Sequence, residues 1–506
     1  MALDILHAER GTLIGDMTNF VTDDALKMEL HDVEEALFRK LLALGKNLLR
    51  EVILQHGNGS VGKKLQLHDG IELKDKGERP TPYLSIFGEI SILRSYYWSK
   101  GCDKGVHPLD STLNLPDSKY SYYLSNFLNK GVADQTYEEV RSNYSNLFGL
   151  KLSKRELESN SIKAGKVLDI YANRKNAPEQ SCEGSVICIQ ADCKGVRMVS
   201  SEKPDQESVE KTGQSFKKGK GEKDGLRKMA VATGDYSFEP EERSPTDMIR
   251  LLMKEMTETD KIDEALRKIE LRKQGIARPR MPLNTQVSAS MSGKGDAFGS
   301  LINRVIKRDP SMSKPIIALI DGEKSLENEL REILEQKSQT HRLDCVILDI
   351  IHVMEYVWKV GNALYGGDQK HERNKWVREK GLAILEGRVG AVIGGLKQTI
   401  KMRNLSESKE KVINGVITYF MNHKHMMRYD KYLMKGYPIA TGFIEGTCGS
   451  LIRDRADRSG ARWSSVGVQS VLNLRAAKKN GWWEEYYSHF VESEKKRLYG
   501  GIKYAG

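Results

Sequence analysis

The stretch GFIEGTCGSLIRDRADRSGARWS, from Gly442 to Ser464, combines residue types that handle phosphates. One carboxylate, Glu445, stands among glycines, each of which costs roughly 1 kcal/mol relative to alanine inside a helix and so indicates a close backbone approach. The four arginines that follow have guanidinium groups that match phosphate geometry. They are Arg453, Arg455, Arg458 and Arg462, and Trp463 is expected to pack beneath them. We expect phosphate binding here; the alternative is a solvated charged helix.

Two further carboxylates end apolar, strand-like runs. Asp192 ends SVICIQAD and Asp321 ends KPIIALID. If they converge with Glu445, the three charges repel one another unless cations lie between them, and hard oxygen ligands suit Mg²⁺ or Mn²⁺. Two such ions can activate an attacking oxygen and stabilise the leaving oxygen of a phosphoryl transfer. The alternatives are that Asp321 caps the next helix, Asp192 is a turn residue and Glu445 is a solvated helix residue.

The order of predicted elements decides whether these carboxylates meet. Strands are expected at 185–192, 227–238, 283–291, 314–321 and 343–349, with helices at 297–308 and 325–336. A helical insertion over 352–436 precedes the segment that contains Glu445. This α/β order is that of a ribonuclease H-like core, in which the ends of the first and fourth strands and the last helix meet at one sheet edge.

The pattern of the N-terminal part predicts a mainly helical DNA-binding region. Thr136 to Glu139 and Ser153 to Glu156 both have the capping-box pattern of a helix start. They enclose a helix and a short turn, which is the arrangement of a helix-turn-helix motif. Lys154 and Arg155 would then open the recognition helix, where base and phosphate contacts fall. The alternative is an ordinary three-helix bundle with solvated basic residues.

The expected organisation has five parts. They are a helical region over 1–80, a β-hairpin with the helix-turn-helix over 81–180, the first part of the core over 181–351, the insertion over 352–436, and the end of the core over 437–506. A net charge of +11 favours a polyanionic partner, nucleic acid first. The start MALDILHAERG has no signal-peptide pattern and no run is apolar enough to span a bilayer, so we expect a cytoplasmic protein without membrane contact.

Several segments resemble the DDE transposases of bacterial insertion sequences, in particular the ISKra-type group, over nearly the whole chain. These segments are FGEISILRSYYW, HPLDSTLNLPDSKYS, QADCKGVRM, YSFEPEERSP, ALIDGEKSL, LDIIHVMEYVWKVGNALYG, YPIATGFIEGTCGSLIRDRADRSGARWS and VQSVLNLRAAKKNGWWEEYY. The resemblance implies a metal-binding catalytic triad of Asp192, Asp321 and Glu445 with two Mg²⁺ or Mn²⁺ ions. It implies cleavage of double-stranded DNA at an element's terminal repeats and strand transfer into target DNA, by a homo-oligomer in the bacterial nucleoid.

Two details of the resemblance leave questions open. Asp349 and His352 resemble an Asp-x-x-His pair shared with Mutator-like transposases; the alternative is a helix cap and a packed core residue. Cys193 stands where the family usually has glycine, which we expect to shift the turn after Asp192. The competing functions are a nuclease that does not join strands and a transposase-derived DNA-binding protein without activity.

Overall fold

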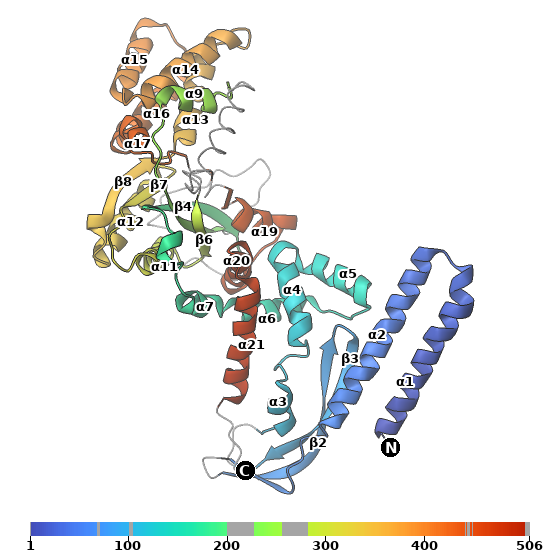
Figure 1. Ribbon diagram of the computed structural model, residues 1–506. Coiled ribbons are helices and arrows are strands. Elements are labelled where there is room, and N and C mark those ends of the chain that lie inside the picture. Colours follow the sequence, from blue (N-terminus) through green and yellow to red (C-terminus); the bar gives the residue numbers. More distant parts are fainter. Residues whose placement is uncertain are drawn as a thin grey trace. The chain divides into compact units, whose positions relative to one another are not determined.

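The computed structural model describes residues 2–67, 71–100, 105–199, 227–255, 282–440, 442, 446–447 and 449–500. Two compact units divide the chain (Figure 1). Unit 1 comprises Met1–Arg174 and Asn473–Gly506, and unit 2 comprises Lys175–Leu472. No helix in the described ranges is both long and apolar enough to cross a membrane.

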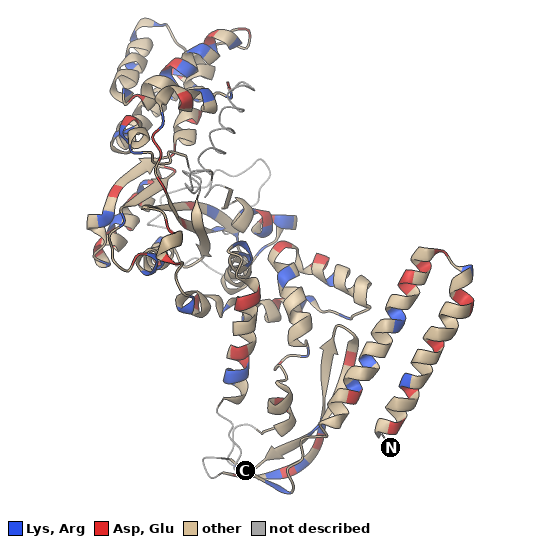
Figure 2. Cartoon of the chain, viewed as in Figure 1, with Lys and Arg blue, Asp and Glu red and all other residues tan. Residues whose placement is uncertain are grey.

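Unit 1 begins with a hairpin of two long helices, α1 (Ala2–Asn19) and α2 (Leu30–Gln55). The two helices are joined by polar contacts: Glu51 accepts hydrogen bonds from His7 (2.9 Å) and Arg10 (2.6 Å). Basic and acidic residues are interspersed along both helices (Figure 2). The side of the hairpin seen in Figure 2 therefore carries charges of both signs.

A three-stranded antiparallel sheet follows, formed by β1 (Lys64–Gln66), β2 (Glu72–Ser85) and β3 (Gly88–Trp98). The expected hairpin is confirmed, with Ser85 paired to Gly88 across the turn. Gly88 has a φ of +114°, a conformation that favours glycine. Ile90 and Ile92 pack with Leu109 and Leu115 into a small core.

The rest of unit 1 is helical. It contains α3 (Pro108–Leu113), α4 (Tyr122–Asp134), α5 (Tyr137–Phe148), α6 (Lys154–Gly165), α7 (Leu168–Arg174) and α21 (Trp483–Tyr499). The first capping box is confirmed, since Thr136 and Glu139 exchange both hydrogen bonds at the start of α5. Gly149 ends α5 in the left-handed conformation.

The second capping box is wrong, although α6 starts where the pattern predicted. Ser153 is the residue before α6, but its side chain makes no capping hydrogen bond. The Tyr120 hydroxyl takes the place of the Glu156 carboxylate: it accepts from the Ser153 N–H (3.3 Å) and donates to Glu156 (3.0 Å). A tertiary contact has thus taken the groups that the local pattern would pair.

Unit 2 is a mixed α/β structure around a five-stranded sheet. Its strands are β4 (Val186–Arg197), β5 (Arg227–Phe238), β6 (Leu283–Ser290), β7 (Ile316–Ile320) and β8 (Leu343–Leu348). They lie in the order β6-β5-β4-β7-β8. The first three are antiparallel, and β4, β7 and β8 are parallel. Every residue of β7 is buried, as expected for a central parallel strand covered on both faces.

Helices complete unit 2. The helices α9 (Pro245–Leu252), α11 (Lys294–Arg308) and α12 (Lys324–Gln336) lie between strands in the chain. After β8 come α13 (Ile350–Leu364), α14 (Lys370–Leu385), α15 (Val389–Met402), α16 (Glu407–His423) and α17 (Tyr429–Met434). These helices lie together next to the β7 and β8 side of the sheet (Figure 1), and they share one hydrophobic core with it.

The chain then returns toward β4. The π-helical turn Gly449–Arg453 packs against β5 and leads into α19 (Asp454–Ala456) and α20 (Ser465–Lys479). Trp463 pairs with the end of β4: its N–H donates to the Arg197 carbonyl (3.0 Å), and its carbonyl accepts from the Val199 N–H (2.9 Å).

Candidate functional site

Asp192 lies in β4 and Asp321 directly follows β7, at matching positions of two neighbouring parallel strands. The register runs from Ile187 opposite Ile316 to Gln190 opposite Leu319. Two residues further along both strands are Asp192 and Asp321. Neighbouring strands lie about 4.8 Å apart, and residues in register point to the same face of the sheet. The strand order therefore brings these two predicted carboxylates together, and both are half-buried.

The electrostatics of the pair reflect this closeness. Burial raises the pKa of Asp321, and the charges of Asp192 and Glu323 raise it further. The Glu323 N–H, which donates to Asp321 Oδ1 (2.9 Å), opposes this effect only in part. Among the described residues, no lysine, arginine or histidine nitrogen lies within 4.0 Å of either carboxylate. Their repulsion is therefore not balanced by an ion pair in that part of the chain.

Asp192 does not lie in a turn, so that interpretation is wrong. Strand β4 continues for five residues beyond it, to Arg197, in unbroken register with β5. Cys193 pairs with Val231 within this ladder, and the expected shift of a turn at this position does not occur. Its thiol instead lies near Glu323, which pairs with Lys294. Burial raises the pKa of Cys193, so its sulfur stays protonated.

The third predicted carboxylate, Glu445, lies outside the described residues. The described residues that precede Glu445 run past the start of α13, since the Ile439 carbonyl accepts from the Ile350 N–H (2.9 Å). After it, Thr447 and Leu451 are buried. Within the ranges that the structure describes, no group of three or more His, Cys, Asp or Glu side chains is arranged to hold a metal ion. The triad therefore stays a prediction. The structure shows only that two of its members, Asp192 and Asp321, are neighbours.

Asp349 extends the row of carboxylates to the next strand. Ile320 of β7 pairs with Leu348 of β8, so Asp349 stands beside Asp321, and its N–H donates to the Ile320 carbonyl (3.0 Å). Asp349 is fully buried and caps α13 by accepting from the Ile351 N–H (2.8 Å). The helix-cap interpretation of Asp349 is therefore correct.

His352 faces this row from the first turn of α13. Its Nδ1 lies 3.4 Å from Asp349 Oδ2. The hydrogen bond with Asp349 raises the pKa of His352 to about 9, helped by the charges of Asp349, Asp321 and Glu355 against the effect of burial. Its side chain is 32% exposed, so it is not the packed core residue of the alternative interpretation. At neutral pH it is an imidazolium close to Asp321.

Two residues of α16 hold the turn after β7, and sequence reasoning missed both. The Tyr419 hydroxyl donates to the Asp321 carbonyl (3.1 Å), and His423 Nε2 donates to the Gly322 carbonyl (2.8 Å). Gly322 has a φ of +89°, and a Cβ there would lie 2.7 Å from the Tyr419 hydroxyl. The only local signal was the glycine after Asp321, because the partners come about 100 residues later in the chain.

The four predicted arginines do not form one surface. Arg453 is exposed, as are Arg458 and Arg462. Arg455 is only 1% exposed, and its guanidinium lies 4.6 Å from the centroid of the Trp463 ring. Trp463 is buried and packs beneath this segment, as expected, and its Nε1 donates to the Ala456 carbonyl (3.1 Å). In this arrangement Arg455 stabilises the segment and does not face solvent, whereas the other three are accessible to a phosphate.

The segment with these arginines is anchored to the strand of Asp192. Besides the pairing of Trp463 with the end of β4, Lys194 lies 3.6 Å from Asp457. Lys194 is two residues beyond Asp192 on the same strand. The exposed arginines therefore belong to a segment that packs along β4 past the carboxylate pair.

Lys154 and Arg155 open α6 in unit 1, and both are exposed. Lys154 pairs with Glu138 at 2.5 Å across the turn between α5 and α6. A phosphate would have to compete with that carboxylate for Lys154. Arg155 has no such ion pair among the described residues.

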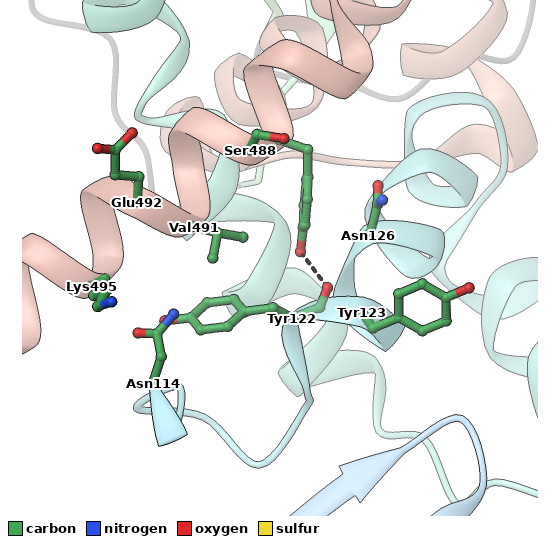
Figure 3. A pocket seen from close by; sticks show the side chains of 9 residues that line it. Asn114, Tyr122, Tyr123, Asn126, Ser488, Val491, Glu492 and Lys495 are labelled. Atoms are coloured by element: carbon green, nitrogen blue, oxygen red, sulfur yellow. Dashed lines mark hydrogen bonds between the residues drawn. The ribbon is translucent and has the colours of Figure 1, made fainter. Parts of the chain in front are cut away.

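Unit 1 also contains a cavity of about 470 Å³ between α4 and α21 (Figure 3). The ring of Tyr122 extends toward Asn114, while Tyr123 points away, and the Tyr487 hydroxyl donates to the Tyr122 carbonyl (2.9 Å). One carboxylate and one ammonium group, those of Glu492 and Lys495, complete the polar lining. The cavity contains no cluster of acidic, thiol or imidazole groups, so the carboxylate row of unit 2 is the stronger candidate for chemistry.

A comparison with models of protein families finds no match, and no curated protein matches the sequence.

Proposed function

We propose that this chain is a DNA transposase of the DDE type, which cleaves the ends of an insertion sequence and joins them to target DNA. The observation that supports this best is the placement of Asp192 and Asp321 at matching positions of adjacent parallel strands, with no lysine, arginine or histidine nitrogen of the described structure within 4.0 Å of either carboxylate. The sheet order β6-β5-β4-β7-β8 also fits a ribonuclease H-like core, which supports the same proposal.

The residues present fit a divalent metal site. Asp192 and Asp321 offer hard oxygen donors at the point where burial and the charge of Asp192 raise the pKa of Asp321, and a bound cation would relieve the repulsion between the two carboxylates. We propose that both residues hold Mg²⁺ or Mn²⁺ together with Glu445. Two such ions would supply activation of the attacking oxygen and stabilisation of the leaving one.

The chain's own groups would position the DNA around this site. The imidazolium of His352, close to Asp321, is suited to contact a phosphate oxygen. Arg453, Arg458 and Arg462 would bind the backbone without reading its sequence. Lys154 and Arg155 of unit 1 would contact the terminal repeats. We further propose that the protein acts as a homo-oligomer on double-stranded DNA in the bacterial cytoplasm.

The test is a joining assay with labelled candidate element ends and a plasmid target, in Mg²⁺ or Mn²⁺. We expect Asp192→Asn, Asp321→Asn and Glu445→Gln each to reduce cleavage and joining to background while DNA binding is retained. Asp344→Asn is the matched control, because Asp344 lies at the other end of β8 and pairs with the exposed Lys435. Near-normal cleavage by any of the three variants would remove that residue from the site. Cleavage without joining by the unaltered protein would favour the nuclease alternative.

A further inference from the structure

A groove of about 680 Å³ lies between α13 and α16, outside the carboxylate row. Helix α13 contributes Tyr356 and Lys359. The residues from α16 recur every three or four positions, so they form one face of that helix. They are Ser408, Lys411, Val412, Gly415, Val416, Thr418, Tyr419 and Asn422.

The groove is basic and polar at its rim. Lys359 and Lys411 are both exposed, and in the described part of the chain neither ammonium group has a carboxylate within ion-pair distance. Lys359 Nζ lies 4.1 Å from the centroid of the Tyr356 ring, which fixes it over the groove wall. Ser408, Thr418 and Asn422 add exposed polar groups. These are the features of a surface that binds a phosphate backbone.

The floor of the groove is left open at Gly415. This residue lies within α16, where glycine destabilises a helix relative to alanine. A Cβ at this position would meet no atom within 4 Å. The glycine is therefore not required by packing inside the chain, and the space above it is available to a ligand.

One end of the groove reaches the candidate active site. Tyr419 lines the groove, and its hydroxyl donates to the Asp321 carbonyl. Tyr356 stacks on Tyr419 with 3.9 Å between ring centroids. A ligand in the groove would thus lie against the two rings that support the turn of Asp321.

We propose that this groove binds the DNA strand that flanks the phosphate attacked at Asp192 and Asp321, with Lys359 and Lys411 on its backbone phosphates. The location of the attacked phosphate rests on the function proposed above. The lining face of α16 from Ser408 to Asn422 is about 20 Å long at 1.5 Å per residue. A DNA strand carries a phosphate about every 3.4 Å of helix axis, so the groove suits several nucleotides and exceeds what one free phosphate would occupy.

The first test measures how DNA binding by the full-length protein depends on salt. The probe is a fluorescein-labelled 30-base-pair duplex with a single-stranded 3′ flank. Each lost phosphate contact lowers the log–log slope by about 0.7–0.9. We therefore expect the double variant Lys359→Ala/Lys411→Ala to have a slope shallower by about 1.4–1.8. The matched control, Lys375→Ala/Lys409→Ala, removes exposed lysines of α14 and α16 that do not line the groove and leaves the slope unchanged.

The second test fills the groove without changing its charge. Gly415→Leu places a side chain in the open space and improves the helix propensity of α16. We expect DNA affinity to fall at least fivefold while unit 2 stays folded, as judged by circular dichroism and thermal unfolding. An unchanged slope in the lysine variant, or normal affinity in Gly415→Leu, would overturn the proposal. If Asp321→Asn kept full cleavage, the proposed function would fail, whereas the slope and the affinity would still decide whether the groove binds DNA.

Discussion

Gly322→Ala gives the sharpest test of how the Asp321 turn is built. The added methyl would lie 2.6 Å from Leu348 Cδ1 and 2.7 Å from the Tyr419 hydroxyl. The left-handed conformation at a φ of +89° costs an L-residue about 1–2 kcal/mol, and overpacking costs about 1–3 kcal/mol. Alanine also makes the unfolded chain less flexible than glycine does, which offsets about 0.4–1 kcal/mol of this loss in stability. We therefore expect Gly322→Ala to lower the stability of unit 2 by roughly 2–4 kcal/mol.

Hydrogen exchange of the amides of β7 and β8 measures this effect, because these buried strands exchange only when unit 2 opens. The control is Gly394→Ala in the interior of α15, where a Cβ would meet no atom within 4 Å. That variant should stabilise α15 by up to about 1 kcal/mol, the opposite sign. Cleavage should also fall in Gly322→Ala, since Asp321 is the preceding residue. Unchanged exchange in Gly322→Ala, or equal losses in both variants, would refute the reasoning.

Two further predictions concern charged groups of unit 2. Arg308 is 1% exposed and pairs with Glu183 (2.7 Å) and Asp235 (2.8 Å). Arg308→Met should cost about 3–5 kcal/mol in urea unfolding, because it leaves the buried Glu183 without an ion pair and Asp235 with Arg304 alone; a loss below 1 kcal/mol would contradict this. The pKa of His352 is raised to about 9 by Asp349, so the stability that His352 adds is complete below about pH 6.5 and is lost as the pH rises through 9. In EDTA, the thermal unfolding temperature of the unaltered protein should fall as the pH rises through 9, and that of His352→Gln should fall less. Parallel pH profiles for the two proteins would argue against a stabilising charge on His352.

Much of the sheet could be predicted from the sequence, because buried strands read as short apolar runs between polar segments. The order of those runs also predicted that Asp192 and Asp321 would be neighbours. The end of β4 could not be predicted in the same way. Residues 193–197 include a cysteine, a lysine and a glycine, and they are extended because β5 pairs with them. Partners 30 to 38 residues away decide that conformation, and no local pattern reveals it.

Arg455 and Ser153 show the same limit in the side chains. An arginine between charged residues is typical of a solvated face, yet Arg455 is buried against Trp463. Ser153 had the spacing of a capping box, yet the hydroxyl of Tyr120, 33 residues earlier, accepts from the Ser153 N–H and donates to Glu156. In both cases the position of the aromatic partner depends on the fold, since Trp463 is held by its pairing with the end of β4 and Tyr120 lies 33 residues before Ser153.

Helix α16 supports the turn at Asp321, where the carboxylates of Asp192 and Asp321 repel each other. Two carboxylates on adjacent strands push their backbones apart unless the surrounding structure holds them, and such unfavourable arrangements persist only where neighbouring contacts over-determine the conformation. The buried strand β7 fixes one side of Asp321, and the hydrogen bonds from Tyr419 and His423 fix the other. A helical region inserted between β8 and the segment of Glu445 can therefore do more than extend the surface. It holds the backbone of the turn at Asp321 from outside the sheet, and through Tyr419 it connects that turn to the groove proposed for DNA.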